Sequence, residues 1–75
     1  MPKLPVLSGK ELIDILVRLG FEEIRQKGSH VSLQKIIGDK KFRTVVPLHK
    51  ELAKGTLRDI LNQCGLTKED LIANM

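Results

Sequence analysis

The sequence is short of cysteine and of aromatic residues. Its 75 residues include one cysteine, Cys64, two phenylalanines, and no tryptophan or tyrosine. A single cysteine cannot form an intramolecular disulfide, so we expect a reducing, cytoplasmic environment. The N-terminus lacks the apolar run of a signal peptide, and no segment approaches the roughly 20 apolar residues that span a bilayer. We therefore expect one soluble domain without a membrane anchor.

Motifs for cofactors and metals are also missing. The sequence has no GxGxxG run, no Walker loop and no GxSxG elbow. His30, His49 and the distant Cys64 do not have the spacing of a zinc site, so neither a metal nor a cofactor is expected. With only Phe21 and Phe42 available, recognition of bases by aromatic stacking, as in RRM or OB domains, is poorly supported. Any RNA binding is expected to be directed at the backbone.

What the sequence does contain is positive charge concentrated in one segment. The formal net charge is +4. Residues 25–50 hold seven lysines and arginines against one aspartate, so this segment is +6 and the remainder is −2. Such segregation suits a polyanion, and nucleic acid is favoured over an anionic membrane because no basic amphipathic helix is apparent. The alternative is a solvated hairpin whose charges keep an exposed sheet edge from aggregating.

Gly28 and Ser29 separate two strand-like runs and predict a tight β-hairpin. Gly28 supplies the positive φ that a type II′ turn needs at its first central position. Lys27 then faces His30 across the turn, on the polar face of the hairpin. The same register predicts two further pairs on this face: Arg25 with Ser32, and Glu23 with Gln34. The opposite, apolar face is predicted to hold Ile24, Val31 and Leu33.

Capping signals place three helices. The pairs with capping-box spacing are Ser8 with Glu11, Thr56 with Asp59, and Thr67 with Asp70. Gly20 and Gly65 are natural ends for the first two helices, and the short third helix is expected to run toward Asn74. The first helix is predicted to bury a stripe of Leu12, Ile13, Leu16 and Val17. Cys64 ends the stripe of the second helix and is interpreted as a small buried apolar residue.

A second, longer turn at residues 38–41 is predicted to lead into a third strand at residues 42–46. Pro47 ends this strand, and residues 48–54 form a connector that carries His49. Because Val45 and Val46 are adjacent, the sequence leaves open which of them faces the core. The resulting order is helix, three antiparallel strands, helix and short helix. This order predicts a two-layer α+β domain in which the polar sheet face stays open.

Three blocks of sequence, taken in order, resemble the HicA (YcfA-like) family of toxin mRNA interferases. The blocks are Gly28-Ser29-His30 after the strand at residues 21–27, Val46-Pro47-Leu48-His49-Lys50-Glu51-Leu52, and Lys54-Gly55-Thr56-Leu57-Arg58-Asp59-Ile60-Leu61. The resemblance covers about residues 8–72 and implies a single HicA-like domain over residues 1–75, with a fold similar to double-stranded RNA-binding domains. It also implies a small ribonuclease with His30 as the catalytic histidine. Its partner would be a HicB-type antitoxin protein encoded alongside.

The chemistry of the residues agrees with this resemblance. RNA is cleaved without a metal when an imidazole takes the proton of a 2′-hydroxyl, that oxygen attacks the adjacent phosphate, and a cation stabilises the growing charge. His30 and Lys27 fit these two roles. The residues expected to bind RNA are Arg25, Lys27, Ser29, Lys41 and Arg43. His49 is a possible second acid or base. A structural role, in which its side chain bonds to a loop carbonyl or a helix start, is an equally good interpretation.

Two other functions stay open at this point. The chain could be a non-catalytic RNA-binding module of the double-stranded RNA-binding type, with His30 an inert polar residue on a strand. It could also be an inactive family member kept as a protein-binding subunit. For the antitoxin, an acidic surface over residues 25–50 is expected to bury His30 and Lys27. Apolar anchors would hold it in place, and the candidates are Pro47, Leu48 and the segment Leu4 to Leu7.

Overall fold

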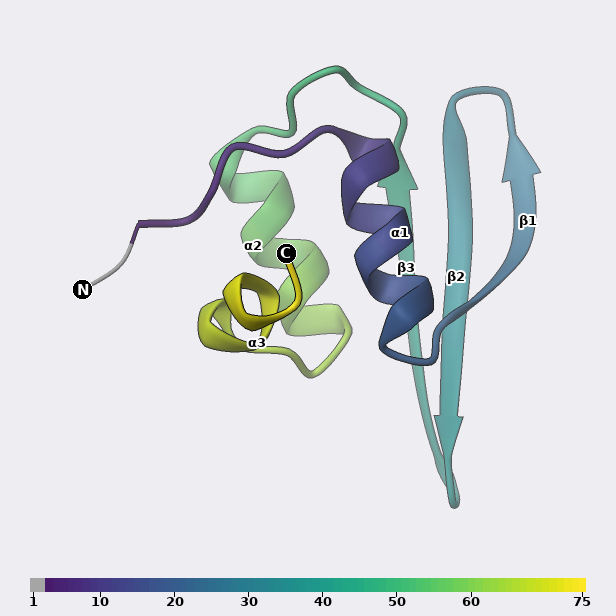
Figure 1. Ribbon diagram of the computed structural model, residues 1–75. Helices are drawn as coiled ribbons and strands as arrows, with labels where there is room; N and C mark the ends of the chain where they lie inside the picture. The colour runs from purple at the N-terminus through teal and green to yellow at the C-terminus, as the bar shows by residue number, and fades with distance from the viewer. Residues whose placement is uncertain (1–2) are drawn as a thin grey trace.

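The computed structural model describes residues 3–75, which form a three-stranded sheet and three helices (Figure 1). The elements, in chain order, are α1 (Gly9–Arg18), β1 (Glu22–Lys27), β2 (His30–Ile37), β3 (Lys40–Pro47), α2 (Lys54–Gln63) and α3 (Lys68–Ala73). The sheet is antiparallel throughout, with the strand order β1-β2-β3. The α+β class and the predicted element order are confirmed. No helix within residues 3–75 has the length and apolarity needed to cross a membrane.

The first helix begins with the predicted capping box. The Ser8 hydroxyl accepts from the Glu11 amide at 3.1 Å, and the Glu11 carboxylate accepts from the Ser8 amide at 2.9 Å. These bonds satisfy amides that would otherwise have no partner at the helix start. The buried stripe differs from the prediction at one position, because Ile15 is buried whereas Val17 is 46% exposed. Val17 lies on the side of α1 that faces Glu23 and Gln26 of β1, and these side chains leave it partly open to solvent.

The β1–β2 hairpin has the predicted turn. Gly28 has φ +59°, and no residue other than glycine has a positive φ within residues 3–75, so the turn is type II′ rather than type I′. Lys27 pairs with His30, as predicted. Arg25 also pairs with Ser32, as predicted.

Beyond Arg25, the predicted register of β1 is wrong. A β-bulge between Glu23 and Arg25 pairs Glu23 with Leu33 and leaves Gln34 opposite Glu22. The extra residue moves Glu23 to the face that the helices cover. Ile24, at the bulge, is 37% exposed and lies outside the core, whereas the sequence predicted it on the apolar face. The bulge therefore changes which side chains of β1 reach each face of the sheet.

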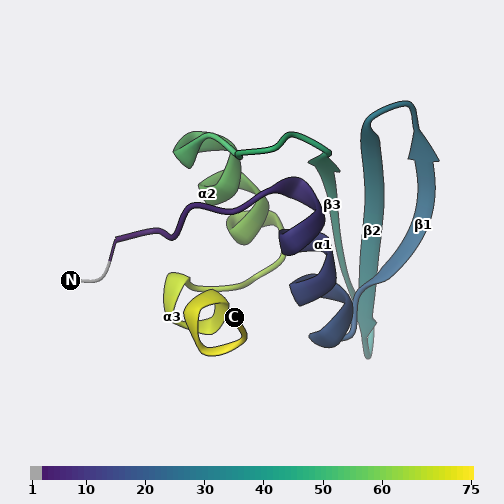
Figure 2. The ribbon, with the colours of Figure 1, turned by 45° about the horizontal axis from the view of Figure 1, so that its top comes forward.

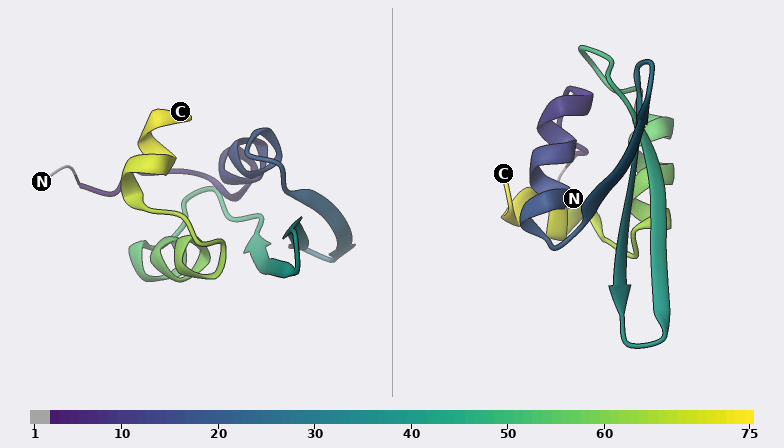
Figure 3. Two further views of the ribbon diagram at one scale, coloured as in Figure 1. Left: turned by 90° about the horizontal axis from the view of Figure 1, so that it is seen from below. Right: turned by 90° about the vertical axis from the view of Figure 1, so that its right-hand side faces the viewer.

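The β2–β3 turn is tighter than predicted. Ile37 pairs directly with Lys40, so only Gly38 and Asp39 lie in the turn, and β3 begins at Lys40 rather than at residue 42. The end of this hairpin projects beyond the helices (Figures 1 and 3). Val46 is fully buried and Val45 is 45% exposed, which settles the alternation that the sequence left open.

The second helix begins earlier than its capping signal suggests. Helix α2 starts at Lys54 after Ala53, whose side chain makes no capping hydrogen bond, so the predicted capping box of Thr56 with Asp59 is wrong. Tertiary contacts fix this helix instead. The Thr44 hydroxyl of β3 donates to Gln63 Oε1 at 2.7 Å.

The C-terminal helix is an integral part of the core. Thr67 and Asp70 form the predicted capping box, and Leu71 is fully buried. Arg18 Nη2 donates to the backbone carbonyl of Asn74 at 3.0 Å, so α3 is tied to the end of α1 (Figure 2). Cys64 is buried among the same apolar residues, and burial raises the pKa of its thiol to about 11. This confirms the interpretation of Cys64 as an apolar core residue.

Candidate nucleic-acid interface

The antiparallel register gathers the predicted basic residues and His30 on the sheet face that the helices leave open, which we call the open face. Successive rows across the open face are Lys27 with His30; Arg25 with Ser32 and Val45; Glu22 with Gln34 and Arg43; and Ile36 with Lys41. Residues directly opposite one another in a ladder project to the same side. All four predicted cations, and His30 itself, are exposed. The open face therefore carries four cations and a single carboxylate, that of Glu22.

His30 is the first residue of β2 and is held at one end of the open face by its neighbours. Across β2 it pairs with Lys27 on one side and with the buried Pro47 on the other. The preceding turn is fixed from both sides: the Leu48 amide donates to the Ser29 carbonyl at 2.7 Å, and Gln26 Nε2 donates to the Gly28 carbonyl at 3.2 Å. The turn before His30 is thus fixed by hydrogen bonds to its two carbonyls, and the imidazole of His30 is exposed.

His49 lies at the same end of the sheet, two residues after the Pro47 that pairs with His30. Its side chain is exposed, and its backbone carbonyl accepts from the Gly9 amide at 2.9 Å. Gly9 is required here, because a β-carbon at this position would clash with the Pro47 carbonyl. The close approach of α1 to the end of β3 therefore holds the connector that carries His49 beside the turn that carries Ser29.

Lys35 belongs to the basic segment but lies outside the open face. Its ammonium donates to the Leu19 carbonyl at 2.5 Å and lies 5.9 Å from the centre of the Phe21 ring. A cation at this place satisfies a carbonyl at the C-terminal end of α1 and interacts favourably with the helix dipole. Lys35 is thus a structural residue. The alternation of β2 could have shown this, because Lys35 lies between Gln34 and Ile36 of the open face.

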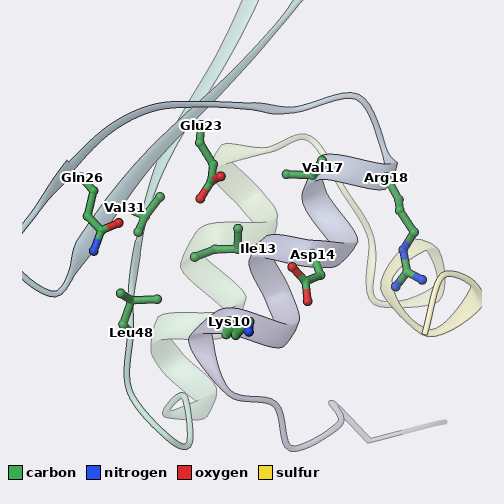
Figure 4. Close-up of a pocket in the computed structure, with 9 residues that line it drawn as sticks. All are labelled: Lys10, Ile13, Asp14, Val17, Arg18, Glu23, Gln26, Val31 and Leu48. Atoms are coloured by element: carbon green, nitrogen blue, oxygen red, sulfur yellow. The ribbon is translucent and has the colours of Figure 1, made fainter.

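A second surface feature was not anticipated from the sequence. A groove of about 600 Å³ lies between α1 and the β1–β2 hairpin, and we call it the α1–β1 groove (Figure 4). Its lining residues are Lys10, Ile13, Asp14, Val17, Arg18, Glu23, Gln26, Val31 and Leu48. Without the bulge, Glu23 would lie on the open face, so the sequence alone gave no signal for this groove.

The sequence matches a known family over most of its length. A family model described as HicA toxin of bacterial toxin–antitoxin matches residues 9–66, well over half of the chain. The chain belongs to the HicA toxin family. The protein is therefore a toxin of a toxin–antitoxin system. A search of curated proteins finds no match.

The family match adds two points to the geometry. Residues 9–66 contain the whole open face with His30 and Lys27, and also His49 on the connector, whereas α3 follows the matched range. A toxin of such a system is paired with an antitoxin. Within residues 3–75, the His, Cys, Asp and Glu side chains form no group of three or more that could hold a metal ion.

Proposed function

We propose that this HicA toxin is a metal-independent endoribonuclease, an mRNA interferase that cleaves mRNA and so inhibits translation and growth. The observation that carries the proposal is the position of His30. It is an exposed imidazole in the same row as Lys27, at the end of a sheet face that carries three further cations. A titratable base next to a cation is the arrangement that cleavage of RNA by its own 2′-hydroxyl requires.

In this mechanism the neutral imidazole of His30 removes the proton from a ribose 2′-hydroxyl. The 2′-oxygen attacks the adjacent phosphorus, the bond from phosphorus to the 5′-oxygen breaks, and the products are a 2′,3′-cyclic phosphate and a 5′-hydroxyl. Lys27 lies across the strand pair from His30 and would stabilise the additional negative charge on the phosphorane. Ser29, in the turn between these two residues, would hydrogen-bond a phosphate oxygen.

The departing 5′-oxygen needs a proton, and His49 is the candidate that supplies it. The structure holds the backbone of His49 at the same end of the sheet as His30 through its bond to Gly9. An imidazolium at His49 would donate its proton to the leaving oxygen. Exchange with water would then return a proton to His49 and remove the one that His30 had taken. The two histidines would then act as base and acid in one step.

The rest of the open face would hold the RNA strand. Lys41 is level with Ile36, six residues along β2 from His30, which corresponds to about 20 Å at the rise of an antiparallel strand. Arg25, Arg43 and Lys41 occupy successive rows over this distance and would contact phosphates. Because such contacts read charge rather than bases, affinity should depend strongly on salt.

The antitoxin is proposed to be a HicB-type protein whose acidic surface covers the open face. Such a surface would bury His30 with Lys27 and exclude RNA by competition. Complementary charge speeds association and selects the partner, and apolar contacts slow dissociation. Of the apolar anchors expected from the sequence, Pro47 is buried in the free protein and Leu48 is 39% exposed. In the segment Leu4 to Leu7, Leu7 is buried, whereas Val6 is 70% exposed.

The test is cleavage of a labelled RNA by the purified toxin in the presence of EDTA. We expect cleavage that leaves cyclic phosphate ends, and no cleavage of the same sequence with 2′-O-methyl groups. His30→Ala should bind RNA without cleaving it. A folded wild-type protein that binds RNA and never cleaves it would instead establish the alternative, a non-catalytic RNA-binding module.

A further inference from the structure

We propose that the α1–β1 groove is the docking site of the protein antitoxin and that it takes an aliphatic side chain of that partner. The inference deepens the proposed function and rests on it in one respect, namely that the antitoxin is a protein. It concerns a surface distinct from the open face, on the other side of β1.

The floor of the groove is aliphatic, and it is accessible at Val17 and Leu48, whereas Ile13 and Val31 are buried. Ile13 and Val17 of α1, Val31 of β2 and Leu48 of the connector line it (Figure 4). Val17 is 46% exposed and Leu48 is 39% exposed, so the floor presents apolar surface to water in the free protein. Burying such surface against a partner is favourable by about 25 cal/mol per Å².

The polar groups around the groove carry both signs of charge. Lys10 and Arg18 lie on α1 together with Asp14, while Glu23 and Gln26 come from β1. Arg18 is already bonded to the Asn74 carbonyl. A polyanion would meet the Asp14 and Glu23 carboxylates here, so nucleic acid is disfavoured. A protein segment with an aliphatic side chain and flanking polar groups of both kinds is complementary to this lining.

The hairpin above the groove has little cover of its own. Every residue of β1 is exposed, and β1 is an edge strand of the sheet. The bulge between Glu23 and Arg25 turns Glu23 toward α1. In the free protein this side of β1 therefore contacts mainly solvent, which leaves the space that a partner would fill.

The groove is continuous with the candidate catalytic residues. Gln26 lines the groove, and the next residue, Lys27, pairs with His30 on the open face. Leu48 lines the groove, and its amide donates to the Ser29 carbonyl. A stable protein interface buries about 800 Å² on each partner, more than a few side chains in one groove supply. One antitoxin anchored in the groove can reach this area by extending over the β1 edge onto His30.

The test uses the toxin with the antitoxin protein encoded alongside it, in the His30→Ala background so that RNA is not cleaved. Val17→Glu places a carboxylate on the groove floor at an exposed helix position. Ile72→Glu, at a 38% exposed position of α3 away from the groove, is the matched control. We expect Val17→Glu to weaken antitoxin binding at least tenfold and Ile72→Glu by less than twofold, with RNA affinity unchanged in both. Equal antitoxin affinity of the two variants would overturn the proposal.

A second measurement needs no substitution in the groove. The methyl groups of Val17, which is 46% exposed in the free protein, should become shielded from a soluble paramagnetic probe when the antitoxin binds. Unchanged accessibility of Val17 in a saturated complex would overturn the docking site. Failure of the proposed function would look different. The free toxin would then not cleave RNA, while the antitoxin would still bind in the groove. An antitoxin that proves to be an RNA bound on the open face would also overturn the inference.

Discussion

The open face and the α1–β1 groove share the strand β1 but have opposite surface chemistry. The open face is a flat sheet surface with four exposed cations and one carboxylate, whereas the groove has an aliphatic floor and a rim of both charges. A surface of one sign attracts a polyanion at long range, and a mixed apolar groove binds at short range by burial. The comparison shows that one hairpin carries two surfaces of different chemistry, a basic face suited to a polyanion and an apolar groove suited to a protein side chain, and that the two meet at the pair of Lys27 with His30.

The largest expected effect is on RNA cleavage, which we assign to His30 of the open face. His30→Ala should reduce RNA cleavage about 100- to 10,000-fold, the range that general acid–base catalysis supplies, and should abolish growth inhibition. The side chain is exposed and fills no core volume, so the melting temperature should stay close to that of the wild type. Cleavage rates and circular dichroism melting together check this. Retained toxicity in a folded variant would remove His30 from the mechanism.

The next effect concerns the stability of the fold. Leu71→Ala should lower the free energy of unfolding by about 2–5 kcal/mol, because it opens a cavity at a fully buried position of α3. The neighbouring, 38% exposed Ile72 should tolerate alanine with a loss below about 1 kcal/mol. Urea denaturation of the two variants measures the difference. Equal stability of the two variants would contradict the assignment of Leu71 to the core.

A smaller effect compares two cations on opposite faces of the sheet, Arg43 of β3 and Lys35 of β2. In the His30→Ala background, Arg43→Ala should reduce the slope of log affinity for single-stranded RNA against log salt by about 0.7, one phosphate contact out of a total slope of about −3. Lys35→Ala should leave the slope unchanged and cost about 1 kcal/mol of stability, because Lys35 satisfies the Leu19 carbonyl at the end of α1. A reduced slope for Lys35→Ala would place RNA on the wrong side of the sheet.

The smallest expected effect is on how stability changes with pH. It arises in the capping boxes of α1 and α3, outside both surfaces. Hydrogen bonds from Ser8 lower the pKa of Glu11, and hydrogen bonds from Thr67 lower the pKa of Asp70. A lowered folded-state pKa gives stability that is present above the ordinary carboxyl pKa and is lost as the pH falls through the lowered value.

The double variant Glu11→Ala, Asp70→Ala should therefore melt below the wild type near pH 6. The gap should narrow as the pH falls below 4, because the wild type then loses the same charged contacts. Melting curves at several pH values give this difference directly. A gap that widens on acidification would contradict the assignment of these two carboxylates as charged caps.

The sequence by itself determined the features that depend on neighbours three or four residues apart. The capping boxes of Ser8 with Glu11 and Thr67 with Asp70 are local contacts, and so is the type II′ turn at Gly28. The row of Lys27 with His30 follows directly from that turn, because a two-residue loop fixes the register beside it. The core of the candidate site was predictable for this reason.

Only the tertiary structure decided features that depend on packing between distant segments. The bulge at Ile24 sends Glu23 to the helix side, and it forms where β1 must curve past α1. Helix α2 starts at Lys54 rather than Thr56, since burial of its apolar residues and the bond from Thr44 to Gln63 fix it. The groove exists because α1 and β1 stand apart at Val17. No local pattern of residues records that separation, because it is set by how the whole sheet fits beneath the helices.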